Sequence, residues 1–292
     1  MTGDAATSAL HAAGGMAVLL GTAGLAVGAI YLAAVWRDAV RPERRTMAWA
    51  LARGFPTHPD DLGAASQDVT VRTPDAEIPA WFVTGGAPDS GRAVVVVHGH
   101  GRSRWDSLRR AVPWIRSSAL VVLPDLRGHG DAPGRSALGR REPADIAALV
   151  AEIEARHPGI RVILAGHSMG GVVAVRTAAL REAAGAPVER VIAWGPYERT
   201  RTPLEARLRA RGLPRAPFST IVLALVDAFD GPDEPLSAAA ARLARTPLEV
   251  IADSTDDVSP ADGARAIAAA APHGTFTPTT GTPHADLGVP GA

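Results

Sequence analysis

The stretch Gly166-His167-Ser168-Met169-Gly170 lies between two segments of different pattern. Residues 160–165 form an apolar, β-branched run that predicts a strand, and residues 171–180 have the apolar pattern of a helix. A sharp turn between strand and helix needs residues without bulk around the serine, as Gly166 and Gly170 are. Such a turn places the Ser168 hydroxyl beside a helix N-terminus, where backbone N–H groups favour developing negative charge.

Chance is the alternative explanation of this motif, because the chain has 30 glycines among 292 residues. No other serine fits the G-x-S-x-G pattern, however, and Ser168 has both the strand before it and the helix after it. We therefore expect Ser168 to be a nucleophile.

Composition excludes several kinds of chemistry. The 30 basic residues balance 30 acidic residues, so no overall field favours nucleic acid. All the basic residues are arginines, which excludes catalysis by a lysine Schiff base, and the chain has no cysteine for thiol catalysis, disulfides or thiolate metal sites. No H-E-x-x-H sequence or carboxylate cluster indicates a metal, and we expect no cofactor.

The N-terminal segment predicts a membrane anchor over residues 1–36, because residues 5–36 carry no formal charge when His11 is neutral. Residues 16–36 would span about 31 Å as a helix, enough to cross a hydrocarbon core. An export signal and a buried helix are the alternatives. Four arginines follow the segment, at Arg37, Arg41, Arg44 and Arg45. Because positive charge beside a span stays in the cytoplasm, we expect a single-pass protein of the cell membrane with its C-terminal part inside the cell.

The rest of the chain predicts a juxtamembrane linker and one globular domain. Residues 37–66 form the linker, in which Met47–Leu51 is a candidate interfacial helix, and residues 67–292 form the domain. Strands are expected at 68–73, 78–84, 93–97, 119–123, 160–165, 190–194, 248–252 and 275–279, and helices at 144–155, 171–180 and 260–271. This alternation predicts an α/β fold with a mostly parallel sheet, doubly wound by helices.

Three ordered motifs carry a resemblance to a known superfamily. His98-Gly99-His100-Gly101 follows a buried strand, Asp125-Leu126-Arg127-Gly128-His129-Gly130 comes next, and Gly166–Gly170 is the third. Over about residues 68–286 the chain resembles the α/β-hydrolase superfamily. The tethered N-terminus and the segment from Asp75 to Val83 look most like its monoglyceride-lipase and serine-aminopeptidase-like branch.

The resemblance implies a Ser-Asp-His triad in that chain order. The nucleophile is Ser168, the acid aligns with Asp256, which has Asp257 beside it, and the histidine is His284 in the last loop. It also implies an oxyanion hole made by the backbone N–H groups of Met169 and His100, with Gly101 as the alternative to His100.

The same resemblance implies a small helical cap formed by the insertion at residues 195–246. Only eight residues follow His284, so the usual closing helix is missing and the support of the histidine loop is an open question. The implied function is a serine esterase or lipase that acts on a small-molecule or lipid ester. The alternatives are a peptidase or amidase with the same triad and a non-catalytic, membrane-bound binding protein. The oligomeric state is not predicted.

Overall fold

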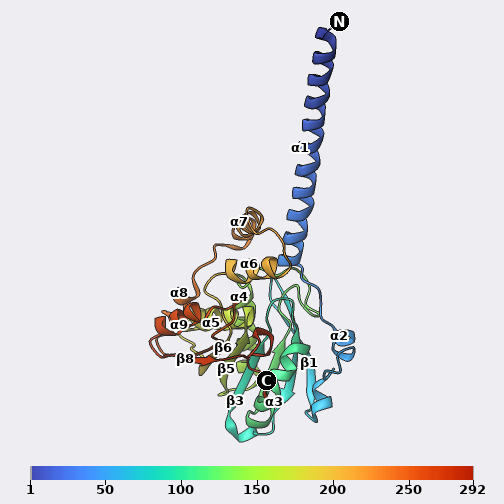
Figure 1. Cartoon of the computed structure of the whole chain (residues 1–292). Helices are drawn as coiled ribbons and strands as arrows, with labels where there is room; N and C mark the ends of the chain where they lie inside the picture. Colours follow the sequence, from blue (N-terminus) through green and yellow to red (C-terminus); the bar gives the residue numbers. More distant parts are fainter. Residues whose placement is uncertain (1, 292) are drawn as a thin grey trace.

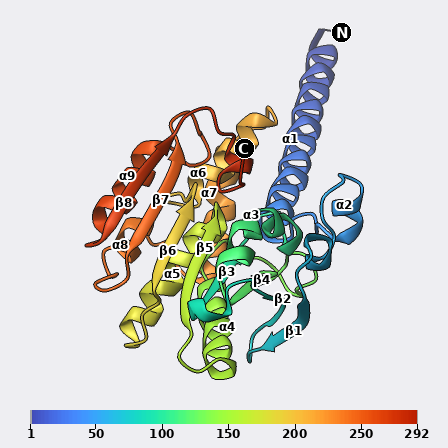
Figure 2. The same ribbon diagram turned by 90° about the horizontal axis from the view of Figure 1, so that it is seen from below.

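An eight-stranded sheet forms the centre of the computed structural model, which describes residues 2–291 (Figures 1 and 2). In spatial order the strands are β1 (Ser66–Arg72), β2 (Glu77–Thr84), β4 (Leu120–Pro124), β3 (Arg92–Val97), β5 (Arg161–His167), β6 (Arg190–Trp194), β7 (Leu248–Asp253) and β8 (Gly274–Thr279). β2 pairs antiparallel with β1 and with β4, and the other neighbouring strands are parallel. In the β3–β5 pair Val97 lies opposite Gly166, so the loops that follow these two strands emerge side by side.

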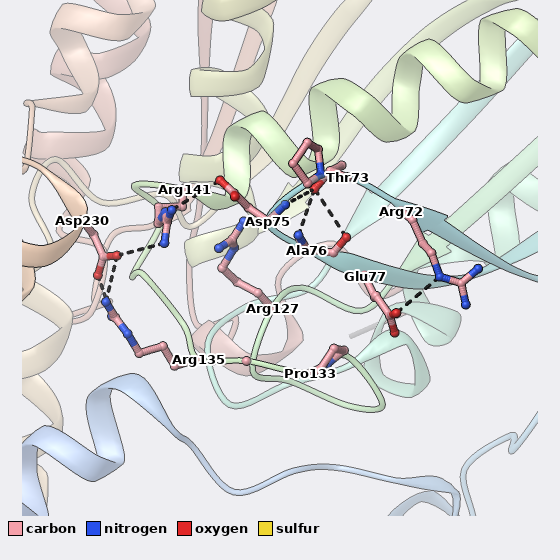
Figure 3. A pocket seen from close by; sticks show the side chains of 12 residues that line it. Arg72, Thr73, Asp75, Ala76, Glu77, Arg127, Pro133, Arg135, Arg141 and Asp230 are labelled. Carbon is pink, nitrogen blue, oxygen red and sulfur yellow. Dashed lines mark hydrogen bonds and ion pairs between the residues drawn. The ribbon is translucent and has the colours of Figure 1, made fainter.

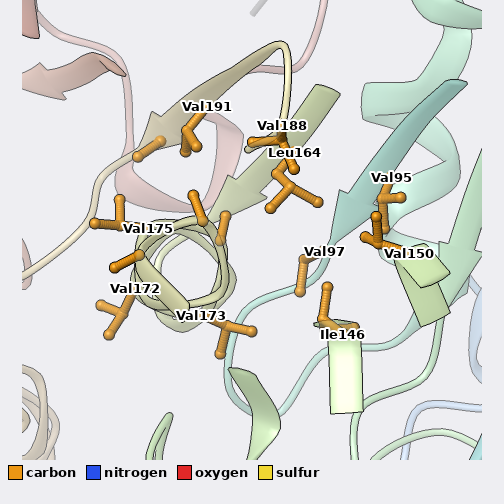
Figure 4. Close-up of a cluster of buried hydrophobic side chains, with 14 of the residues drawn as sticks. Val95, Val97, Ile146, Val150, Leu164, Val172, Val173, Val175, Val188 and Val191 are labelled. Carbon is orange, nitrogen blue, oxygen red and sulfur yellow. The ribbon is translucent and has the colours of Figure 1, made fainter. Parts of the chain in front are cut away.

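Helices cover both faces of the sheet. α3 (Arg104–Ser117) packs on one face, and α4 (Glu142–Arg156), α5 (Met169–Ala183), α8 (Leu236–Ala240) and α9 (Ala261–Ala270) pack on the other. Along β3, Val95 and Val97 face the layer of α4 and α5, whereas Val94 and Val96 face the layer of α3. Figure 4 shows the first of these two cores. A strand buried on both faces reads as a continuous apolar run, and the predicted doubly wound fold is confirmed.

The segment before the sheet is ordered. α2 (Met47–Leu51) forms at the residues expected for an interfacial helix, and short 3₁₀ turns occupy Pro59–Leu62, Pro88–Ser90 and His284–Asp286. Each expected strand is found within two residues of its expected ends. Helix α3 was not predicted.

α1 (Thr2–Val40) projects from the body as a single long helix (Figure 1). Its stretch Gly14–Val40 is long and apolar enough to cross a membrane, and little of its apolar 18-residue window is buried in the protein. The helix continues to Val40, beyond the expected end of the anchor at residue 36. Its last turns are not separate from the fold, because Val35, Ala39 and Val40 are buried against neighbouring helices.

Those neighbours belong to the insertion at 195–246. α6 (Arg201–Ala210) and α7 (Phe218–Asp230) share a hydrophobic cluster with the end of α1. The third helix of the insertion, α8, packs instead with α5 and α9 in the core of the body. Only α6 and α7 therefore form a layer apart from the sheet.

Candidate active site

Ser168 stands at the turn between β5, which ends at His167, and α5, which begins at Met169. Its φ of 54° and ψ of −119° are a strained conformation for a residue with a side chain, at a cost of about 1–3 kcal/mol. A Cβ on Gly166 would lie 2.1 Å from the Gly170 carbonyl oxygen, and one on Gly170 would lie 2.2 Å from the Val97 carbonyl oxygen. The two flanking glycines therefore permit the close backbone packing that forms the turn.

His284 and Asp256 are in direct contact. The His284 Nδ1 lies 2.5 Å from the Asp256 Oδ2, and the Asp256 Oδ1 accepts from the backbone N–H groups of Val258 (2.8 Å) and Ser259 (3.2 Å). Burial opposes ionisation of Asp256, but the hydrogen bond and charge of His284 and these backbone donors outweigh it and lower the pKa of the carboxyl. With Nδ1 donating to Asp256, the His284 Nε2 is left to accept a proton.

The two neighbouring aspartates face elsewhere. Asp257 is largely exposed and lies 3.7 Å from Arg209. Asp253 accepts hydrogen bonds from Thr255, Thr279 and Thr282 at the ends of β7 and β8. Asp256 is therefore the one of the three that contacts His284.

The loop that carries His284 is held by hydrogen bonds from two other segments. Arg110, a buried residue of α3, donates from Nε to the Leu287 carbonyl (2.8 Å) and from Nη2 to the Ala285 carbonyl (2.6 Å). His167, beside the nucleophile, donates from Nε2 to the carbonyl oxygen of His284 (2.7 Å). These bonds support the histidine loop from α3, with which Leu287 shares a hydrophobic cluster, and from the nucleophile turn.

One pocket of about 370 Å³ brings the candidate residues together. Its lining includes Ser168, His284, His167, Gly99, His100 and Arg207. In the part of the chain that the structure describes, the Ser168 hydroxyl makes no hydrogen bond to His284. Such a bond is often long before substrate binds.

Two free backbone donors flank the nucleophile. Within residues 2–291 the N–H groups of Met169 and His100 have no hydrogen-bond acceptor, and the same holds for Gly101. The loop after β3 approaches the nucleophile so closely that a Cβ on Gly99 would lie 3.2 Å from the Ser168 Cβ. The N–H groups of Met169 and His100 are therefore unpaired in segments next to the serine, as candidate oxyanion donors would be.

Comparison with known proteins places the chain in a family. Residues 94–291, more than half of the chain, match the alpha/beta hydrolase family. The chain belongs to the alpha/beta hydrolase family. Among curated proteins, the magnesium-chelatase 30 kDa subunit of Rhodobacter capsulatus is 30% identical over 115 residues, which cover 38% of this chain and 37% of that protein. The match therefore spans little more than a third of that relative.

Solved structures agree with this family at the level of fold. An esterase from Pyrococcus furiosus is similar with a TM-score of 0.63 and 20% identity, over 78% of this chain and 86% of that one. A membrane phospholipase A, described as a bacterial virulence factor, is similar with a TM-score of 0.57 and 17% identity, over 94% of this chain and 93% of that one.

In this alpha/beta hydrolase two turn motifs are tied together by His98. The ring donates from Nδ1 to the Gly99 carbonyl (2.8 Å) and accepts at Nε2 from the Leu126 N–H (3.0 Å). Burial lowers the pKa of His98 to about 4, so the imidazole is neutral at pH 7. The motif His98–Gly101 is thus fixed against the motif that begins at Asp125.

The side chain of His100 makes contacts that the sequence did not predict. Its Nε2 donates to the Ala39 carbonyl at the end of α1 (2.7 Å), and its Nδ1 accepts from the Arg207 Nη1 of α6 (2.6 Å). These partners are 61 and 107 residues away in the chain, and no local pattern signals such a contact. The loop with a candidate oxyanion donor therefore touches both the N-terminal helix and the cap.

A second pocket, of about 550 Å³, lies away from Ser168 between the β1–β2 turn and the loop at 133–141 (Figure 3). Its charged groups pair with one another: Arg135 with Asp230 (2.6 Å) and Arg141 with Asp75 (3.5 Å). In residues 2–291 no group of three or more ligating side chains is placed to hold a metal ion. The pocket at Ser168 is accordingly the candidate active site.

Proposed function

We propose that this alpha/beta hydrolase is a membrane-anchored serine hydrolase that cleaves carboxylic esters through an acyl-enzyme. The observation that carries the proposal is that His284, which lines the same pocket as Ser168, contacts Asp256. A serine hydroxyl is a weak nucleophile until a base removes its proton, and the base needs a partner that fixes its tautomer. These three residues supply the three roles.

The proposed reaction follows from the hydrogen bonds. The Ser168 Oγ attacks the ester carbonyl while the His284 Nε2 takes its proton, and Asp256 stabilises the resulting imidazolium. The N–H groups of Met169 and His100 donate to the oxyanion. His284 then protonates the leaving alcohol, which yields the acyl-enzyme. A water molecule, deprotonated by His284, hydrolyses that intermediate and restores Ser168.

Two apolar surfaces support attachment to a membrane. One is the long exposed helix α1. The other is a stripe on α7 formed by Ile221, Leu225 and Phe229, which are 39%, 39% and 66% exposed and follow one another at every fourth residue. α7 also contacts α1 directly, since the Tyr31 and Phe218 rings are 4.5 Å apart. The stripe therefore lies on a helix that packs against the candidate membrane span.

Within this proposal residues 1–36 are the anchor, 37–66 the juxtamembrane linker and 67–292 the hydrolase domain, with its cap in 195–246. The arginines after the span favour a cytoplasmic domain. A reporter active only in the cytoplasm, fused to Ala292, should be active. Digestion of the C-terminus by protease added to intact cells would contradict this orientation.

A substrate panel tests the activity and the finer placement in the monoglyceride-lipase-like branch. We expect full-length protein in detergent to hydrolyse 4-nitrophenyl esters and monoacylglycerols faster than aminoacyl 4-nitroanilides, and Ser168→Ala to remove the activity on both classes. Faster cleavage of the anilides would favour the peptidase alternative. Absence of turnover in every assay, with folded protein, would favour a non-catalytic binding protein.

A further inference from the structure

The pocket at Ser168 contains an arginine without a counter-ion. Arg207 reaches the pocket from α6, and no carboxylate in residues 2–291 lies within ion-pair distance of it. Its one hydrogen-bond partner in that range is the Nδ1 of His100. Burial is the largest influence on this guanidinium and lowers its pKa. Arg207 is half-buried, and a charge that is partly removed from water without a partner raises the question of what compensates it.

His100 does not compensate this charge. Burial and the adjacent Arg207 hold the pKa of the His100 imidazole well below its usual value, so the ring is a neutral acceptor. With one Nη1 hydrogen bond made to His100, the remaining N–H groups of Arg207 are left to donate elsewhere. The contact with His100 thus orients the guanidinium and does not neutralise it.

Most of the other charged groups that line the pocket form ion pairs within the protein. Arg45 and Arg102 share the carboxylate of Asp106, at 2.5 and 3.1 Å, which leaves one of these two arginines in excess. Arg211 pairs with Asp38 at 3.1 Å. Glu43 also lines the pocket, but its side chain is exposed to solvent. Arg207 is therefore the one arginine of this pocket without a carboxylate partner among the described residues, and Arg102 shares its partner with Arg45.

We propose that Arg207, assisted by Arg102, binds an anionic group of the substrate, so that this hydrolase selects esters that carry a carboxylate or phosphate near the scissile bond. This inference rests on the proposed ester hydrolysis. A guanidinium matches the planar oxygens of a carboxylate or phosphate with two parallel N–H donors. Because Arg207 contacts His100, whose N–H is the proposed oxyanion donor, the anion would lie close to the reacting carbonyl.

Two esters that differ mainly in charge test the inference. We compare kcat/KM for neutral 4-nitrophenyl butyrate and for anionic mono-4-nitrophenyl glutarate, with full-length protein in detergent. The wild type should favour the glutarate ester, and Arg207→Met should lower the ratio of the two kcat/KM values by about 10- to 100-fold, the value of a hydrogen bond to a charged group. Arg207→Lys, which keeps the charge, should restore part of the ratio. Arg215→Met, at an exposed arginine of the cap, should leave the ratio unchanged.

The ratio of the two kcat/KM values distinguishes anion binding by Arg207 from a general loss of activity. Arg207 also contacts His100, so the rate on both esters is expected to fall, and an equal fall would contradict anion binding. Absence of turnover on either ester by the wild type, despite folded protein, would refute ester hydrolysis and this inference with it.

A binding measurement on the wild type covers the case in which the Arg207 variants do not fold. Inorganic phosphate or glutarate should slow labelling by a neutral fluorophosphonate more than sodium chloride of equal ionic strength does. Protection by phosphate alone would indicate a phosphate ester, and protection by glutarate alone a carboxylate. Labelling that neither anion slows would overturn the proposal.

Discussion

Asp256 occupies a buried position in which one carboxylate oxygen meets His284 and the other meets two backbone N–H groups. Replacement by asparagine removes the charge and favours the wrong histidine tautomer. We expect Asp256→Asn to lower kcat by about 10⁴-fold, as the equivalent change does in a serine protease. Ester hydrolysis by the purified variant measures the effect.

Asp257→Asn is the matched control, because its side chain is exposed and lies 3.7 Å from Arg209. This variant should keep nearly full activity. Similar losses in the two variants, or a larger loss in Asp257→Asn, would mean that the acid has been assigned to the wrong residue.

At the scale of single residues, the sequence predicts what a local pattern encodes. The glycines around Ser168 signal a strand-turn-helix geometry, and the structure places Ser168 at that turn. Asp256 and His284 rest on chain order and on a resemblance, and their roles stay predictions although the two side chains are in contact. The sequence gives no such signal for Arg207. Its proposed role depends on the lack of a counter-ion and on a contact with His100, which is 107 residues away in the chain.

The turn between β5 and α5 depends on the contact of Gly170 with the end of β3. A Cβ at this position would lie 2.2 Å from the Val97 carbonyl oxygen, so Gly170→Ala must push two elements apart. We expect the variant to lose most of its activity and to unfold at a lower temperature than the wild type. Overpacking of a well-packed site typically costs about 1–3 kcal/mol.

Gly263→Ala in helix α9 is the control for this substitution. A Cβ there would meet nothing closer than 3.8 Å, and alanine favours a helix over glycine by about 1 kcal/mol. The control should therefore be as stable as the wild type or more stable. A Gly170→Ala variant with wild-type activity and melting temperature would contradict the close packing.

The exposed stripe of α7 leads to a prediction about the hydrolysis of esters that are held in a membrane. Replacing Ile221, Leu225 and Phe229 together by serine should weaken hydrolysis of a long-chain ester in vesicles, since less apolar surface would enter the bilayer. Hydrolysis of a soluble short-chain ester should change little. Leu180→Ser, at an exposed leucine on α5, is the control. Equal effects on the vesicle and soluble substrates would argue against membrane contact by α7.

At the scale of helices and strands, prediction from the sequence succeeded for strands that are buried on both faces. The valine run of β3 is buried on both faces, and such runs can be recognised without a partner strand. Helix α3 was missed because its sequence is rich in arginine and contains Pro113. Its buried face includes Arg104 and Arg110, which gain partners only in the folded chain: Asp125 for Arg104 and the histidine loop for Arg110.

Acid should destabilise the whole molecule through its buried histidines. Burial lowers the pKa of His98 to about 4 and of His129 to about 3, and it lowers the pKa values of His100 and His167 as well. The unfolded chain takes up protons near pH 6.5, while the folded chain keeps these rings neutral. The free energy of unfolding should therefore fall as the pH decreases from about 6.5 to about 4, and each of the four histidines adds to this slope.

Two buried carboxyls act in the opposite direction. Burial raises the pKa of Asp125 to about 6 and also raises the pKa of Glu142, so these groups offset part of the loss at lower pH. Denaturant unfolding in detergent between pH 7.5 and 5 measures the net slope, which four histidines should dominate. His157→Asn, at an exposed histidine, should leave the slope unchanged. A free energy of unfolding that is constant over this range would show that the four rings are not held neutral.

The arrangement of the whole molecule was the least predictable part. The sequence indicates an apolar N-terminal segment and a basic insertion, but their contact depends on side chains such as Tyr31 and Phe218 that lie far apart in the chain. As a result, the end of α1, the cap and the loop of His100 meet beside the candidate active site.

The proposed mechanism depends on Ser168 being a nucleophile, and covalent labelling tests this most directly. Full-length protein is treated with a fluorophosphonate, digested and mapped by mass spectrometry, with Ser168→Ala as the control. We predict a single adduct, on the peptide that contains Ser168. No adduct should form on that peptide in the Ser168→Ala control. An adduct on a different serine, or an unlabelled Ser168 in folded protein, would contradict the account.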